Sequence, residues 1–268
     1  MGNLEVMKCL FGLRFVPVLV AAFAFAGCAG LIRDRIYKPV PIAQTPVSFA
    51  GEAPKPVSVT SPDELQLEGY YWPAATGNDT LVVYFHGNGF NQLVGARRAE
   101  PLKTGGHGVL VASYRGYGGN PGKPSEQGLI SDAEAWMAKA RELAPESRLY
   151  LFGHSLGGAV ALKMAARHPL AGVATLGTFA RLADVAPPIA RKILPDRFDN
   201  LQTISRVKAP IYLLHGTNDQ IVPFAAAARL QKASGGRAVV VPLRDAGHHI
   251  PLDKIAPRVW DLLSSKDR

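Results

Sequence analysis

Two patterns of apolar and polar positions alternate along this chain, from about residue 57 to the C-terminus. Short continuous apolar runs, such as "TLVVYF" (80–85) and "LYLF" (149–152), are typical of buried strands. Segments with apolar residues at helical spacing lie between them, for example "SEQGLISDAEAWMAKARELA" (125–144). Strands that alternate with helices predict an α/β fold, in which helices cover both faces of a mostly parallel, twisted sheet.

Three changes in the pattern divide the chain. Residues 28–56 are rich in proline and have no clear period, so we expect a tether there. Residues 57–268 then form one α/β domain, which opens with two strands around a turn at Pro62-Asp63. Residues 178–206 contain three prolines and little periodicity, and this connector is long enough for a small lid.

Residues 1–27 are expected to form a signal peptide rather than part of the fold. Lys8 and Arg14 precede the apolar stretch "FVPVLVAAFAFAG" (15–27), which is short for a membrane-spanning helix and ends in small residues. Translation starts at either Met1 or Met7, and a start at Met7 would give the more compact signal peptide.

The signal ends in "FAGC" (25–28), which resembles the lipobox of bacterial lipoproteins, although Phe25 stands where leucine is usual. The resemblance implies that Cys28 is lipidated and becomes the mature N-terminus. Ala29 follows it in place of aspartate, which implies the periplasmic face of the outer membrane in the bacterial cell envelope. A plain secretory signal or a membrane anchor is the alternative.

Composition excludes some classes of function. The two cysteines are Cys9, inside the signal, and Cys28, so the mature body has no internal disulfide and no cysteine metal cluster. No HExxH spacing is present, and we predict neither a metal nor another cofactor. The net charge of +9 favours anionic partners or is a solvated basic surface. No basic run carries interleaved aromatic residues, which argues against a nucleic-acid partner.

A single hydroxyl group lies between glycines in "LYLFGHSLGGAV" (149–160). The central residues, Gly153 to Gly157, match the pattern G-x-S-x-G, with Ser155 at its centre. A strand precedes the pattern and helical spacing follows it, so Ser155 should lie on a sharp strand-to-helix turn whose helix N-terminus faces developing negative charge. The five residues alone could be an incidental turn, but this position makes Ser155 a candidate nucleophile.

A serine nucleophile needs a base, and the base needs a carboxylate to orient it. Asp219 follows the predicted strand in "IYLLHGTN" (211–218), and His248 follows the one in "AVVVPLRDAG" (238–247). Because the carboxyl ends of parallel strands share one edge of a sheet, both side chains should approach Ser155 there. We predict His248 as the base and Asp219 as the acid that orients it.

Other residues could take these roles. His249 adjoins the predicted base, and Asp245 or Asp253 could replace the predicted acid, although neither follows a predicted strand. His154, beside the serine, is expected to be structural or to line the pocket. His86 is expected to hold its own loop by hydrogen bonds.

Acyl transfer also needs donors for the oxyanion. The backbone N–H of Leu156, directly after the serine, should supply one of them. The loop "HGNG" (86–89) should supply the other, through the N–H of Asn88, because its glycines allow close approach to a substrate. The alternative for this loop is a simple turn.

Five motifs in order resemble the α/β-hydrolase superfamily of serine hydrolases: "FHGNG", "SYRGYGGNPGKPSEQGL", "GHSLGG", "HGTNDQIVPF" and "DAGHH". Within it they look like the branch of α/β-hydrolase-domain depalmitoylases, lysophospholipid lipases and their bacterial relatives, from roughly residue 36 onward. The resemblance implies Ser155, Asp219 and His248 as nucleophile, acid and base, and a structural role for Arg115 in "YRGYG". His249-Ile250 departs from the Asn-Asp that often follows the base.

The expected function is hydrolysis of carboxylic esters or thioesters through an acyl-enzyme, on acyl-chain or lysophospholipid-like substrates. Dehalogenase and epoxide-hydrolase chemistry is disfavoured, because those enzymes carry aspartate where this chain has Ser155. A peptidase is an alternative that no accessory domain supports. The alternative from another class is a catalytically silent α/β-hydrolase fold that serves as a scaffold or binding module.

Overall fold

The sheet is the centre of the molecule. The computed structural model describes residues 30–42, 47–189 and 191–264. Its eight strands pair in the order β1-β2-β4-β3-β5-β6-β7-β8. β2 is antiparallel to both β1 and β4, and the other pairs are parallel. The strands are β1 (Lys55–Thr60), β2 (Gln66–Trp72), β3 (Thr80–Phe85), β4 (Gly108–Ala112), β5 (Arg148–His154), β6 (Gly172–Leu176), β7 (Ile211–Gly216) and β8 (Val239–Leu243). The predicted α/β fold with a mostly parallel sheet is confirmed.

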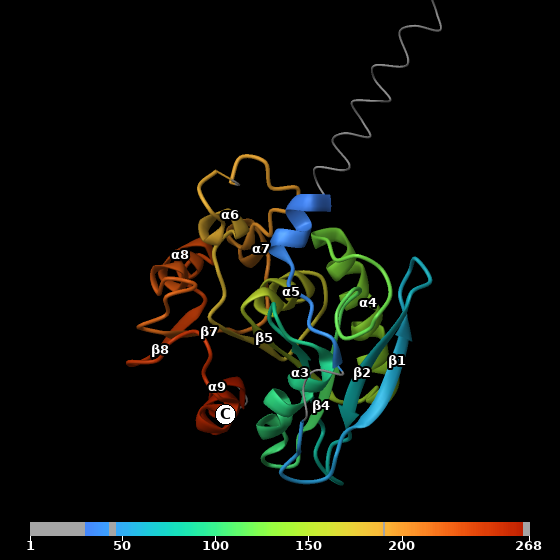
Figure 1. Cartoon of the computed structure of the whole chain (residues 1–268). Helices are drawn as coiled ribbons and strands as arrows, with labels where there is room; N and C mark the ends of the chain where they lie inside the picture. Colours follow the sequence, from blue (N-terminus) through green and yellow to red (C-terminus); the bar gives the residue numbers. More distant parts are fainter. Residues whose placement is uncertain (1–29, 43–46, 190, 265–268) are drawn as a thin grey trace, which may run out of the picture.

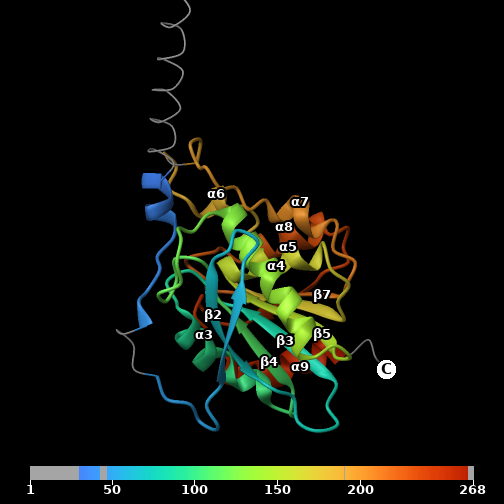
Figure 2. The ribbon, with the colours of Figure 1, turned by 90° about the vertical axis from the view of Figure 1, so that its right-hand side faces the viewer.

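Helices cover the two faces of the sheet (Figures 1 and 2). One face carries α4 (Glu126–Leu143), α5 (Leu156–Ala165), α7 (Asn200–Ile204) and α8 (Ala225–Ala233). The other carries α3 (Gln92–Ala99), the 3-10 turns η2 (Glu100–Lys103) and η3 (Leu252–Lys254), and α9 (Ala256–Ser264). The short α6 (Leu182–Val185) lies in the connector between β6 and β7.

The apolar run of β3 shows why the strand must be covered on both sides. All six of its residues are buried. Leu81, Val83 and Phe85 join the hydrophobic cluster on one face, whereas Val82 and Tyr84 join the cluster on the other. Successive side chains of a strand point to opposite faces, so a continuous apolar run suits a sheet with helices on both sides.

Part of the segment expected to be a tether packs on the domain. Residues 30–36 are helical, and Tyr37 is only 2% exposed. The guanidinium of Arg33 donates to both carboxylate oxygens of Asp196, at 3.0 and 2.9 Å, and the Tyr37 hydroxyl donates to the same carboxylate at 2.9 Å. These partners are about 160 residues away in sequence, so local periodicity carries no sign of them.

The predicted signal peptide and Cys28 lie outside the described residues. Within the described ranges, no helix combines the length and the apolar character needed to cross a bilayer.

Candidate active site

Ser155 lies at the turn between β5 and α5, in a backbone conformation that L-residues rarely adopt. Its φ is 53° and its ψ is −113°. Its N–H donates to the carbonyl of Leu176 at 2.9 Å, and its own carbonyl accepts from the N–H of Gly158 at 3.0 Å. These bonds over-determine the strained turn, and such strain is concentrated at functional sites.

The glycines around Ser155 are required by close backbone packing. A Cβ at Gly153 would meet the carbonyl oxygen of Gly157. A Cβ at Gly157 would in turn meet the carbonyl oxygen of Phe85, at the end of β3. The helix α5 can therefore begin directly against two strand ends only if both positions lack side chains.

His248 and Asp219 form a buried pair. The Nδ1–H of His248 donates to Oδ2 of Asp219 at 2.7 Å, and the two residues are 7% and 5% exposed. The other oxygen, Oδ1, accepts from the N–H groups of Ile221 and Val222 at 2.9 and 2.8 Å. These bonds fix the carboxylate, which in turn fixes the imidazole with Nε2 available as a base.

The alternative acids lie elsewhere. Asp245 and Asp253 are both exposed, and the contacts described for them are to Thr217 and Lys254. His249 does line the same cavity, but its ring stands edge-on to that of His248, with centroids 5.1 Å apart. Burial and the neighbouring His248 lower the pKa of His249.

Gly177 brings β6 close to this pair. Its φ is +61°, and a Cβ there would lie 3.0 Å from Nδ1 of His248 and 3.3 Å from Oδ2 of Asp219. A side chain at this position would therefore be both strained and pressed against the pair.

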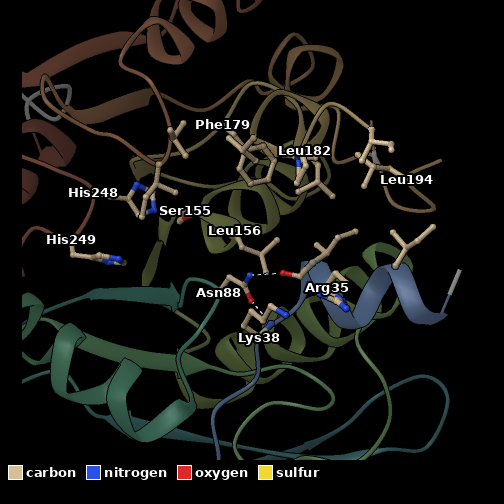
Figure 3. A pocket seen from close by; sticks show the side chains of 18 residues that line it. Arg35, Lys38, Asn88, Ser155, Leu156, Phe179, Leu182, Leu194, His248 and His249 are labelled. Carbon is tan, nitrogen blue, oxygen red and sulfur yellow. Dashed lines mark hydrogen bonds between the residues drawn. The ribbon is translucent and has the colours of Figure 1, made fainter. Parts of the chain in front are cut away.

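A cavity of about 710 Å³ opens beside Ser155. Ser155, Leu156, Asn88 and His248 all line it, so the structure brings four of the five predicted site residues to its surface, with Asp219 behind His248. Figure 3 shows Ser155 beside His248 at one end of the cavity, and Leu194 and the helix that carries Arg35 toward the other. Most of the lining is apolar: Ile32, Ile36, Leu156, Phe179, Leu182, Val185, Ala186, Pro187, Ile189, Leu194, Ile221 and Val222.

The side chain of Asn88 joins the predicted oxyanion loop to the N-terminal segment. Its Oδ1 accepts from the backbone N–H of Lys38 at 2.7 Å and from the Tyr117 hydroxyl at 2.8 Å. Its Nδ2 donates to the carbonyl of Ile36 at 2.6 Å (Figure 3). Residues 32–38 therefore form one wall of the cavity, a role that sequence reasoning did not assign to them.

Two buried histidines support the loops around the site. Nδ1 of His86 donates to the carbonyl of Gly87 at 2.9 Å, and its Nε2 accepts from the Ser113 hydroxyl at 3.1 Å. Burial lowers the pKa of His86 to about 4, so the ring is neutral at pH 7. The loop-holding role expected for His86 agrees with this geometry.

His154 is the second of these histidines. Its Nε2–H donates to the carbonyl of His248 at 3.1 Å, which ties the loop of the predicted base to the residue next to Ser155. Burial, and to a lesser extent the charge of Arg98, lower the pKa of His154 well below its usual range. No local pattern predicts this bond, since its partners are 94 residues apart.

Arg115 of "YRGYG" lies away from the cavity. Its guanidinium bonds the carboxylates of Asp132 and Asp63, at 2.7 and 2.6 Å, and its own N–H donates to Asp132 at 2.8 Å. This network agrees with the structural role expected for it. In the described ranges, no group of three or more His, Cys, Asp or Glu side chains could hold a metal ion.

Comparisons with known proteins agree with this fold. The family model described as serine aminopeptidase, S33, matches residues 76–203. The uncharacterised protein Rv2307c of Mycobacterium tuberculosis is 36% identical over 255 residues, 89% of each chain. The uncharacterised protein YfhR of Escherichia coli is 26% identical over 274 residues, 93% of this chain and 92% of the relative.

Solved structures share the architecture. The Pyrococcus furiosus esterase Pf2001 superposes with a TM-score of 0.70 at 19% identity, over 85% of this chain and 97% of the esterase. A soluble variant of monoglyceride lipase from Saccharomyces cerevisiae gives 0.66 at 18% identity, over 83% and 97%. The chain belongs to the α/β-hydrolase superfamily of serine hydrolases.

Proposed function

We propose that this protein is a serine esterase that cleaves carboxylic esters or thioesters through a covalent acyl-enzyme. One observation carries the proposal: the strained Ser155 lies at the end of an apolar cavity, beside a histidine whose Nδ1–H is held by a buried aspartate. The hydrolase family to which the chain belongs supports the same chemistry.

The mechanism follows from this arrangement. Nε2 of His248 accepts the proton of the Ser155 hydroxyl as its oxygen attacks the ester carbonyl. The N–H groups of Leu156 and Asn88 stabilise the oxyanion that forms, and His248 returns the proton to the leaving alcohol or thiol. Water, deprotonated by the same nitrogen, then attacks the acyl-enzyme, and the acid and free serine are released.

The lining of the cavity favours acyl chains. Twelve of its eighteen described lining residues are apolar, and Arg35 and Lys38 carry its permanent charges. An aminopeptidase must bind a positively charged amino terminus, and no carboxylate side chain is among these lining residues. An acyl chain with an anionic or neutral head, as in a lysophospholipid, fits this surface better.

The test is hydrolysis of p-nitrophenyl esters from acetate to palmitate, together with labelling by a fluorophosphonate probe. Ser155→Ala should lose both turnover and labelling. His248→Gln should lower kcat by roughly 10³–10⁴, whereas the matched variant His249→Gln should lower it by about tenfold at most. A folded protein with neither turnover nor labelling would instead favour the silent scaffold, and equal losses in the two histidine variants would contradict the assignment of the base.

The proposal extends to location. We propose that Cys28 carries a lipid anchor that holds the protein at the periplasmic face of the outer membrane. The lipobox-like "FAGC" supports this, and so does the place of Ile32 in the cavity lining, since an enzyme acting on lipids benefits from a nearby anchor. Mass spectrometry of the mature N-terminus tests it: an unmodified or absent Cys28 would refute the anchor.

A further inference from the structure

Four exposed aliphatic side chains belong to the lining of the cavity or to residues next to that lining in the chain. They are Leu31, Ile189, Ile193 and Ile221, which are 70%, 89%, 61% and 54% exposed, and we call them the rim. Across the described ranges, Val239 at 46% is the other large hydrophobic residue with comparable exposure. Exposed apolar residues that gather in one place mark an interaction site, whereas scattered ones do not.

The rim comes from segments that lie side by side. The bonds between Arg33 and Asp196 hold helix 30–36 against the connector that follows α6. Figures 1 and 2 both show these two segments at the same end of the molecule. Ile189 and Ile221 line the cavity, and Leu31 and Ile193 are the chain neighbours of the lining residues Ile32 and Leu194. The rim residues therefore gather at the end of the molecule where the cavity lies.

Substrate binding alone does not explain the rim. Leu31 and Ile193 do not line the cavity, and yet each keeps more than half of its surface in water. An exposed isoleucine or leucine gains stability only when another apolar surface covers it. The rim therefore needs an occupant larger than a ligand inside the cavity.

The charges around the rim indicate what this occupant is. Residues 30–38, 187–189 and 191–193 carry four exposed basic side chains, which are Arg35, Lys38, Arg191 and Lys192. In the same ranges, Asp34 is the single exposed carboxylate. Aliphatic side chains flanked by lysine and arginine suit the interface of an anionic bilayer. Protein interfaces are instead rich in tyrosine and tryptophan and poor in lysine, and the rim contains neither aromatic residue.

The path of the chain points the same way. Residue 31 follows Cys28 by three residues, which span at most about 10 Å when fully extended. Any attachment of Cys28 to a bilayer would therefore keep the rim within reach of the lipid headgroups.

We infer that the rim docks on an anionic lipid bilayer, with its aliphatic side chains in the boundary between headgroups and acyl chains. The four basic side chains then lie at the level of the phosphates, and the cavity mouth faces the lipid. This docking does not depend on hydrolysis, so it stands or falls separately from the esterase proposal.

The test uses the full chain with Cys9→Ser and Cys28→Ser and one added cysteine that carries a bimane fluorophore. Ile193→Cys reports on the rim, and Leu31→Cys gives a second position on it. Val239→Cys is the matched control, because it replaces an exposed aliphatic residue at the N-terminal end of β8, whereas the cavity lies at the carboxyl ends of the strands. The vesicles contain phosphatidylglycerol or phosphatidylcholine, with brominated acyl chains as quenchers.

Docking should shift the emission of the two rim labels to the blue and expose them to the brominated chains in phosphatidylglycerol vesicles. The control label should not change. Replacing Arg191 and Lys192 with glutamine should lower the ratio of docked to undocked protein by roughly fivefold for each positive charge removed.

Three results would overturn the inference. The first is a rim label that the brominated chains do not quench although the protein binds the vesicles, as shown by co-flotation. The second is equal quenching of rim and control labels, or equal quenching in both lipids. The third is a blue shift without vesicles that grows with protein concentration, which would mean that a second copy of the chain covers the rim.

Discussion

Removing the side chain of Asn88 should detach the N-terminal wall of the cavity while keeping the backbone N–H at that position. Asn88→Ala deletes the two hydrogen bonds that join this side chain to Ile36 and Lys38, besides those to Tyr117 and to the N–H of Gly89. Each such bond contributes about 1 kcal/mol, and the contacts at the exposed surface fall at the low end of that range. A total of about 2 kcal/mol corresponds to roughly a 30-fold increase in the opening of residues 36–38.

Hydrogen exchange measures this opening directly, because the amide of Lys38 donates to the side chain of Asn88. Its protection factor should fall by about 30-fold in Asn88→Ala. Tyr117→Phe is the matched control, since it deletes a bond to Asn88 but none to residues 36–38, and it should lower the protection by about fivefold at most. Turnover of long-chain esters should fall with the protection. Unchanged exchange at Lys38 in Asn88→Ala would refute the argument that this side chain holds the wall.

Three further predictions concern the site and its support. Asp219→Asn should lower kcat by roughly 10⁴ in ester-hydrolysis assays, because the amide no longer fixes the tautomer of His248; a loss below tenfold would contradict that role. Burial lowers the pKa of His86 to about 4, and the unfolded chain, with a pKa of about 6.5, binds that proton first as the pH falls. Up to about 3 kcal/mol of stability, fully present above pH 6.5, is therefore lost between about pH 6.5 and 4. The free energy of unfolding, measured by urea denaturation at several pH values in this range, should fall less steeply with falling pH in His86→Gln than in the wild type. Arg115→Met leaves the fully buried Asp132 carboxylate without its cation and should lower the free energy of unfolding by about 3–5 kcal/mol, measured by urea denaturation; a loss below 1 kcal/mol would mean that Asp132 is protonated or rehydrated at little cost.

The sequence allowed most of the sheet and the placement of the site to be predicted, since both depend on local signals. Apolar runs mark the parallel strands, and polar residues directly after them are brought to one edge by the topology. Ser155, Leu156, Asn88 and His248 meet at the cavity for this reason, although they come from three different strand ends.

The helix α3 was missed for a physical reason. Its buried face consists of Gln92, Gly95, Ala96 and Ala99, which are small or polar, so no stripe of large apolar residues appears in the sequence. The N-cap Asn91, whose side chain accepts from the N–H of Val94, was the one available signal.

The N-terminal wall was missed because its partners are remote in sequence. Asp196 lies about 160 residues after Arg33 and Tyr37, and Asn88 lies 50 after Lys38. A single chain offers no pattern that links such positions. The prolines of residues 28–56 indicated a tether, whereas a few specific bonds were enough to dock its first part.

The way in which this wall is attached has a consequence for how relatives of the protein could diverge. The side chain of Asn88 forms hydrogen bonds with the backbone of residues 36 and 38 and not with their side chains. Mutations at positions 32, 35, 36 and 38 can therefore change the shape and charge of the cavity while the segment stays in place and the catalytic strands are untouched. An engineer, like natural selection, could alter substrate preference here by exchanging a short N-terminal stretch instead of redesigning the core.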